Sequence, residues 1–120
     1  MVPRGLSGLM ARHEIVVAVV VSLDTTEKEV VGDRTALESD YVLRTLFDDL
    51  SVQQIQEYLE DQILPRLAQQ GRVCGVVCKP TENTVVGLYY HDERDVIQRY
   101  QTSKIIDAEV RELWSAITDG

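Results

Sequence analysis

The side chains best suited to chemistry stand together in the run His91-Asp92-Glu93-Arg94-Asp95. One imidazole with three carboxylates can hold a divalent cation or transfer protons in acid–base catalysis. The candidate catalytic set is therefore His91, Asp92, Glu93 and Asp95. Neighbouring residues do not all point the same way, however, and acidic side chains are also favoured where a helix begins. The run is compatible with a small metal-dependent or acid–base enzyme and, more often, with the solvated start of a helix.

No other pattern in the sequence carries a recognisable chemistry. Serine-nucleophile motifs, phosphate-binding glycine loops, dinucleotide-binding turns, zinc-protease motifs and calcium-loop spacing are all absent. On one face of a strand, Cys74 and Cys78 lie about 13 Å apart, which is too far for a disulfide. Without a second cysteine pair or a nearby histidine, they do not make a zinc site. We therefore predict two buried thiols, no cofactor and no metal.

Charge and hydropathy exclude several classes of partner. Twenty acidic against twelve basic residues give a net charge of −8, and no run of Lys or Arg is present. Nucleic-acid binders normally carry a basic stripe, so nucleic acid and membranes are disfavoured as direct partners. The apolar run Ile15–Val21 is seven residues long, whereas a membrane-spanning helix needs about 18. With no signal-peptide pattern and with reduced cysteines, the expected location of this acidic protein is the cytoplasm.

Two valine-rich hairpins form the expected scaffold. Residues 14–23 hold five Val and one Ile, residue types that suit a strand. This strand is apolar on both faces, so it is covered on both sides, is central in a sheet, or lies at a dimer seam. A turn over 24–27 leads to a return strand over 29–31. The second hairpin joins strands over 72–78 and 84–90 through a turn at 79–83.

Amphipathic helices are expected to accompany the hairpins. One runs over 33–50 and another over 51–71, with a break near Pro65 because proline disrupts a helix. A last helix over 103–118 carries Ile106, Val110 and Trp114 on one face. Between the second hairpin and this helix, residues 93–102 fit either a helix or an edge strand.

The length and the order of elements predict one α+β domain, with two β-hairpins in a mainly antiparallel sheet and amphipathic helices packed on it. The opening Met1–Gly5 looks like the thrombin site used to remove purification tags. Residues 1–11 are therefore expected to be a tag remnant or a disordered terminus, and residues 12–120 the domain. Residues 19–32 match residues 74–87 at six of fourteen positions. An internally duplicated hairpin-helix unit and a chance likeness of valine-rich hairpins are both open.

These features favour a non-catalytic protein-interaction or regulatory module that acts as a homodimer or as a subunit of a larger assembly. A strand that is apolar on both faces needs two covers, and another protein or a second copy of the chain can supply one of them. The predicted interface residues are Ile15, Val17, Val19, Val21, Tyr90 and Trp114. The alternatives are the small enzyme that uses the His91–Asp95 run and a small-molecule sensor with a pocket lined by Tyr58, Tyr89 or Trp114.

Overall fold

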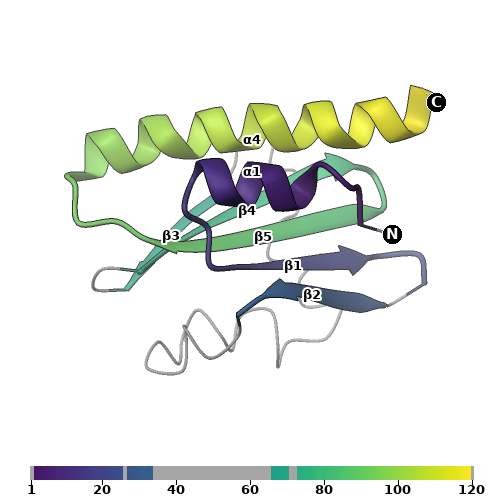
Figure 1. Cartoon of the computed structure of the whole chain (residues 1–120), viewed down its shortest axis with the longest axis horizontal. Coiled ribbons are helices and arrows are strands. Elements are labelled where there is room, and N and C mark those ends of the chain that lie inside the picture. The colour runs from purple at the N-terminus through teal and green to yellow at the C-terminus, as the bar shows by residue number, and fades with distance from the viewer. Residues whose placement is uncertain (1, 26, 34–65, 71–72, 120) are drawn as a thin grey trace.

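The computed structural model describes residues 2–25, 27–33, 66–70 and 73–119. Its five strands form one antiparallel sheet in the order β2-β1-β5-β4-β3. The α+β class, with two hairpins in an antiparallel sheet, is confirmed. The helices α1 (Leu6–Arg12) and α4 (Val96–Asp119) lie over one face of this sheet (Figure 1). The strands are β1 Val17–Ser22, β2 Lys28–Gly32, β3 Arg66–Gln70, β4 Val73–Thr81 and β5 Thr84–His91.

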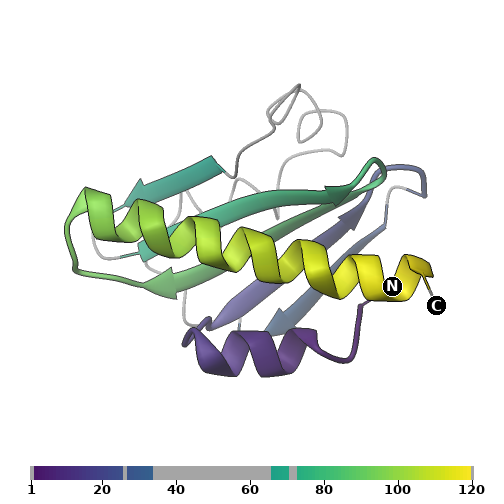
Figure 2. The same ribbon diagram turned by 90° about the horizontal axis from the view of Figure 1, so that it is seen from above.

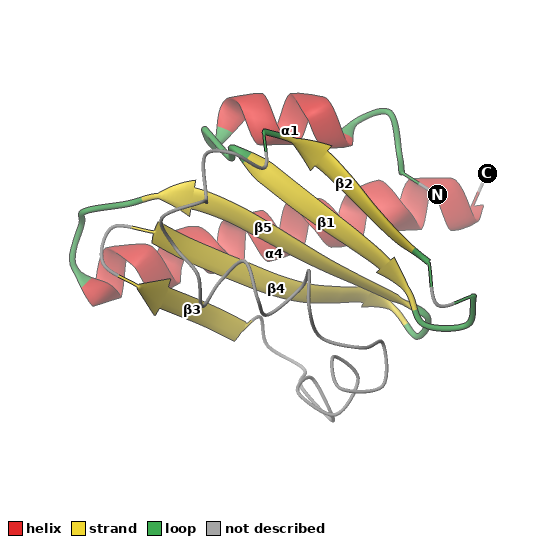
Figure 3. Ribbon diagram, turned by 90° about the horizontal axis from the view of Figure 1, so that it is seen from below, coloured by secondary structure: helices red, strands yellow, loops and turns green. Residues whose placement is uncertain are grey.

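The strand β1 is buried on both faces, as its apolar pattern predicts. Ala18 and Val20 belong to a core cluster that also contains residues of α1 and α4. Val17, Val19 and Val21 alternate with them and therefore point to the opposite face, where they too are buried. Figure 3 shows the molecule from that opposite side, with both described helices behind the sheet. β1 therefore contributes to apolar packing on both sides of the sheet.

The two hairpins meet along β1 and β5. Across this pair Val17 lies opposite Tyr89, and Ser22 lies opposite Thr84. The tips of the hairpins are also joined, because the Leu23 amide donates a hydrogen bond to the Asn83 carbonyl at 2.7 Å. The described strands therefore form one continuous sheet instead of two independent hairpins.

The sequence likeness between the hairpins does not extend to their strand register. Val19 pairs with Val30 in the first hairpin. The residues aligned with them in the second hairpin are Cys74 and Val85, yet Cys74 pairs with Tyr90. Matching residues of the two segments thus occupy different positions in their hairpins, and the duplication gains no support from the register.

The strand β4 is longer than expected. It continues through Pro80 to Thr81, although the sequence predicts a turn at 79–83. The pairing with β5 is irregular between Cys78 and Thr81, and such an irregularity is where a strand tolerates proline. The turn is reduced to Glu82 and Asn83.

Residues 66–70 form the strand β3, which corrects the prediction of a helix over 51–71. β3 pairs antiparallel with β4, so that Leu67 lies opposite Val76. Pro65 explains why a helix does not extend to this point, because proline lacks the amide hydrogen and clashes with the preceding turn. Pairing with β4 then satisfies the backbone groups that follow. The rest of this expected helix, and the one over 33–50 apart from Asp33, lie outside the described residues.

Residues 6–11 are not a disordered terminus, which corrects a second prediction for that part of the segment 1–11. Residues 6–12 form α1, and Leu6, Leu9 and Met10 are buried in the core cluster. Their spacing of three and four residues places them on one side of the helix. The likeness to a protease site covers only the opening residues, and those that follow form a helix because the sheet offers them an apolar surface. Figure 2 shows α1 beside α4 on the same face of the sheet.

The ambiguous segment 93–102 is helical from Val96 onward. Asp95 caps this helix, because its carboxylate accepts a hydrogen bond from the Gln98 amide at 2.9 Å, which is the geometry of an N-cap. α4 continues to Asp119 and buries Ile106, Val110 and Trp114, as predicted. Among the described helices, none is long and apolar enough to cross a membrane.

Candidate functional site

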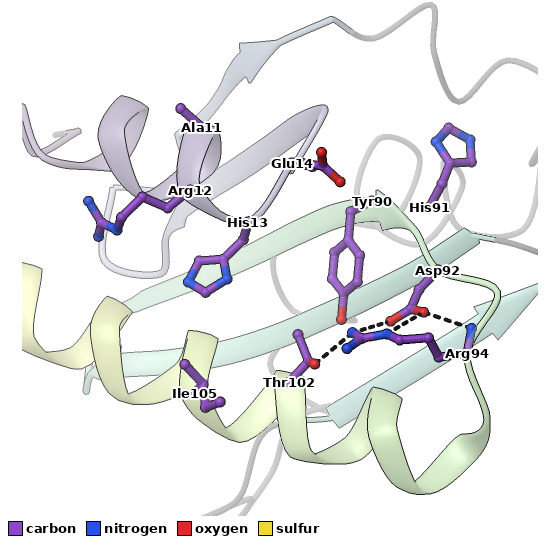
Figure 4. Close-up of a pocket in the computed structure, with 10 residues that line it drawn as sticks. All are labelled: Ala11, Arg12, His13, Glu14, Tyr90, His91, Asp92, Arg94, Thr102 and Ile105. Atoms are coloured by element: carbon purple, nitrogen blue, oxygen red, sulfur yellow. Dashed lines mark hydrogen bonds and ion pairs between the residues drawn. The ribbon is translucent and has the colours of Figure 1, made fainter.

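The run His91–Asp95 does not form one catalytic or metal-binding group. His91 is exposed at the end of β5, and its ring points away from Asp92 (Figure 4). Asp92 is buried, whereas Glu93 and Asp95 are exposed. In the part of the chain that the structure describes, no three His, Cys, Asp or Glu side chains are grouped to hold a metal ion. For Asp95, which caps α4, the interpretation as the start of a helix is correct.

Asp92 is engaged by Arg94. The guanidinium donates to both carboxylate oxygens, at 3.0 Å from Nε and at 2.7 Å from Nη2. The backbone amide of Arg94 donates to the same carboxylate at 2.9 Å. These hydrogen bonds favour the charged form and lower the pKa of Asp92. A carboxylate with a lowered pKa is a weak general base. We therefore interpret the Asp92–Arg94 ion pair as structural.

The six predicted interface residues are buried in the interior of the protein. The prediction assumed that the chain leaves β1 partly uncovered, and the burial of its valines on both faces removes that reason. Exposed fractions lie between 0 and 6 % for all six, which are Ile15, Val17, Val19, Val21, Tyr90 and Trp114. A surface for a partner therefore has to be sought among other side chains.

Cys74 and Cys78 are free, buried thiols on β4, as the sequence predicts. Both belong to the core cluster on the helix-covered face. Burial raises the pKa of Cys74, and it raises the pKa of Cys78 well above its ordinary value, because a thiolate is disfavoured away from water. Neither thiol has the lowered pKa of a reactive nucleophile.

Tyr89 and Trp114, two of the aromatic residues expected around a sensor pocket, lie on opposite faces of the sheet. Trp114 belongs to the core cluster between the sheet and the helices, as does Tyr90. Tyr89 precedes Tyr90 on β5 and therefore points to the opposite face of the sheet. Tyr58 lies outside the described residues.

A cleft that the sequence analysis did not anticipate opens where α1 ends. It has a volume of about 450 Å³ and lies between the end of α1, the end of β5 and the first half of α4 (Figure 4). Its lining includes Arg12, His13, Tyr90, Asp92, Arg94 and Ile105. These residues come from opposite ends of the chain, so no local pattern links them. The one signal available was the adjacency of a tyrosine to a dense polar run at 91–95.

Two polar links frame the cleft. On one side, Nε2 of His13 lies 2.7 Å from a carboxylate oxygen of Glu109, which connects the end of α1 to α4. On the other side, Nη2 of Arg94 donates to the Thr102 hydroxyl at 2.7 Å, which connects the end of β5 to α4. Both links attach the cleft walls to the same helix, so its width is set by side chains of α4.

The turn after α1 shapes the wall next to His13. The Ile15 amide donates to the Met10 carbonyl at 2.9 Å, and the Glu14 amide donates to the Ala11 carbonyl at 3.4 Å. This is the hydrogen-bond pattern of a Schellman turn. Glu14 has a φ of 55° there, a left-handed conformation that glycine usually supplies. The chain leaves the helix layer at this residue and enters the sheet as β1.

The Tyr90 hydroxyl has no hydrogen-bond partner in the part of the chain that the structure describes. The side chain is buried, and Figure 4 shows its hydroxyl directed toward Arg94 and Thr102. Burial raises the pKa of Tyr90, so the hydroxyl remains protonated at neutral pH and can donate a hydrogen bond. Most buried polar groups are paired, so this hydroxyl is the exception to be explained at the cleft.

Comparison with known proteins reveals a likeness of fold. The chain is similar in structure to MglB of Myxococcus xanthus, with a TM-score of 0.54 and 7 % sequence identity over 91 % of this chain and 90 % of that one. A Roadblock/LC7 domain from Streptomyces avermitilis gives a TM-score of 0.48 and 17 % identity, over 88 % of this chain and 91 % of that one. MglC of Myxococcus xanthus gives 0.49 and 10 %, over 82 % and 85 %. No family model and no curated protein matches the sequence. The likeness to MglB shows a shared fold, in agreement with the α+β arrangement of the sheet and helices.

Proposed function

We propose that this protein is a non-catalytic protein-interaction or regulatory module that acts as a homodimer or as a subunit of a larger assembly. The observation that carries the proposal is a set of apolar side chains exposed on the first half of α4. Exposed apolar patches on folded domains mark contact surfaces for other proteins. The exposed fractions are 64 % for Val96, 69 % for Ile97, 38 % for Tyr100 and 55 % for Ile105.

Two further observations support the proposal. The fold shared with MglB is consistent with a regulatory or interaction role. The candidate catalytic run places its buried carboxylate, Asp92, in an ion pair with Arg94, which leaves it poorly suited to proton transfer. A cytoplasmic location is part of the proposal, because Cys74 and Cys78 are free thiols and a reducing compartment keeps them so.

Native mass spectrometry on the protein purified gently from its source cells tests this function. We expect the mass of two chains or of a complex with another protein. The Ile97→Lys variant should lose most of that assembly, since it places a charge on the exposed apolar surface. Ala116→Lys is the matched control, because it adds the same charge at an exposed position in the second half of the same helix, away from these apolar side chains, and should keep the assembly.

A monomer at every concentration, with no bound protein, contradicts the proposal. Equal loss of assembly in both variants contradicts the assignment of the surface to the apolar side chains, because charge alone then explains the result. Each variant must melt like the wild-type protein, so that unfolding is excluded as the cause.

A further inference from the structure

We propose that the cleft at the end of α1 is a docking site for an acidic segment of a partner protein. In this complex a carboxylate of the segment binds Tyr90 and Arg94, and an adjoining apolar side chain packs on Ile105. The inference rests on the interaction role proposed for the protein and gives that role a specific recognition chemistry.

Of the groups toward which the Tyr90 hydroxyl points, Arg94 is a donor and the Thr102 hydroxyl already accepts from it, and the carboxylates nearby are also engaged. Asp92 accepts three hydrogen bonds from Arg94. Glu109, which lies outside the lining, is bonded to His13 of the opposite wall. The remaining acid of the lining, Glu14, lies beside the other end of the Tyr90 ring from the hydroxyl (Figure 4). A ligand that enters here therefore has to supply acceptors, and a carboxylate supplies the strongest ones.

The Tyr90 hydroxyl independently indicates a missing acceptor. It is a protonated donor, buried and without a partner among the described residues, and an unsatisfied buried donor destabilises the fold. Its neighbour Arg94 shares one nitrogen, Nη2, between Asp92 at 2.7 Å and Thr102 at 2.7 Å. By giving up the bond to Thr102 and keeping those to Asp92, the guanidinium frees one N–H of Nη2 for a carboxylate that also accepts from Tyr90.

The apolar edge of the cleft favours a protein segment over a free anion. Ile105 lines the cleft and is 55 % exposed, and a free anion has no apolar group to cover it. The exposed Ile97 lies two turns earlier on the same helix, so the apolar surface continues beyond the cleft. A volume of about 450 Å³ falls within the roughly 300–1,000 Å³ of ligand pockets, which is room for side chains of a bound segment.

Nuclear magnetic resonance on the isotope-labelled full chain tests the inference. The probe is a short, end-capped peptide of alternating leucine and glutamate, and its controls are the leucine–glutamine counterpart and sodium acetate. We expect the leucine–glutamate peptide to shift the Arg94 Nε–H and Ile105 methyl signals. The glutamine peptide should bind about tenfold more weakly, since it loses a charge-assisted hydrogen bond.

Two matched variants locate the carboxylate contact. Tyr90→Phe removes only the hydroxyl and should weaken the peptide about five- to tenfold. Tyr89→Phe makes the same change on the opposite face of the sheet and should leave the affinity unchanged. Equal weakening by the two variants overturns the inference, because the effect is then not local to the cleft.

The remaining outcomes separate this inference from the proposed function. If acetate binds as tightly as the peptide, the cleft is a free-anion site only and the inference is overturned. If the peptide does not shift Arg94 and Ile105 while native complexes persist, the inference is overturned and the interaction role stands on another surface. If the peptide does not bind and the chain also forms no complex, both proposals fail.

Discussion

The two halves of α4 belong to one continuous helix but differ in what they contact. In the second half, Val110 and Trp114 are buried in the core cluster. In the first half, Val96 and Ile97 are more than half exposed, at 64 % and 69 %. Both halves carry apolar residues, so composition does not distinguish them. The same residue types therefore stabilise the fold in the second half of α4 and are available for recognition in the first half.

The short helix α1 packs beside only one half of α4. Gly5 packs so closely on Leu113 that a side chain at position 5 would collide with it, and His13 contacts Glu109. α1 therefore lies along the second half of α4. It ends at Arg12, and the cleft opens beyond its end, beside the first half (Figure 4).

The largest predicted effect distinguishes two adjacent isoleucines. Ile106 is fully buried, whereas Ile105 is 55 % exposed. We expect Ile106→Ala to lower the free energy of unfolding by about 2–5 kcal/mol, because it leaves a cavity in the core. Ile105→Ala should change it by less than about 0.5 kcal/mol. Urea denaturation of both variants checks this, and a similar loss in the two would remove the distinction between the buried and the exposed side of the helix.

The next effect concerns the ion pair at the cleft wall. Asp92→Asn removes the negative charge that faces Arg94 while keeping the side-chain shape. We expect a loss of about 1–2 kcal/mol in the free energy of unfolding, moderated because Arg94 is half exposed. The control His91→Asn alters the exposed neighbour and should be near neutral. Thermal melts at neutral pH compare them, and equal stability of wild type and Asp92→Asn would show that the pair does not hold the wall.

Acid should reduce the stabilisation that the Asp92–Arg94 ion pair gives to the folded protein. The pKa of Asp92 is lower in the folded protein than in the unfolded chain, so the unfolded chain takes up the proton first as pH falls. The stabilisation is fully present above the unfolded value of about 3.9. It is lost as pH falls further, through the folded value. Melting temperatures from pH 6 down to pH 2 should therefore fall less steeply for Asp92→Asn than for the wild type.

The smallest predicted effect is a stabilisation, and it concerns the turn that follows α1. Glu14 holds a left-handed φ of 55°, so Glu14→Gly should raise the free energy of unfolding by about 0.5 kcal/mol. Glu29→Gly, in the strand β2, should lower it by about 0.5–1 kcal/mol, because glycine weakens an extended segment. A denaturation series comparing the two variants checks the signs. Destabilisation by Glu14→Gly would mean that the Glu14 side chain contributes a contact that outweighs the backbone strain.

Several elements could be predicted because local chemistry determines them. The valines of 14–23 indicate a strand buried on both faces, and β1 is such a strand. The spacing of Ile106, Val110 and Trp114 indicates the buried side of the last helix. Acidic residues before Val96 indicate the start of a helix, and Asp95 caps α4. In each case the signal lies within a few neighbouring residues.

The elements that were missed depend on contacts between distant parts of the chain. Leu67 fits the apolar face of a helix equally well, and only pairing with β4 makes 66–70 a strand. Leu6 and Leu9 follow residues that resemble a protease site, and only their burial against the sheet and α4 shows that they belong to the fold. The sequence suggests Tyr90 as an interface residue, and only the position of its hydroxyl next to the Arg94 side chain makes it part of a cleft (Figure 4).

The sequence by itself determined the α+β class, the two hairpins, the buried thiols and the capped amphipathic helix, because periodicity, valine content and capping act over short distances. The tertiary structure alone decided which apolar residues are buried. It also brought Arg12 and His13 near Tyr90 and Arg94, and left the Tyr90 hydroxyl unpaired. The physical reason is that burial and the pairing of polar groups depend on what packs against a residue, and here that neighbour comes from the other end of the chain.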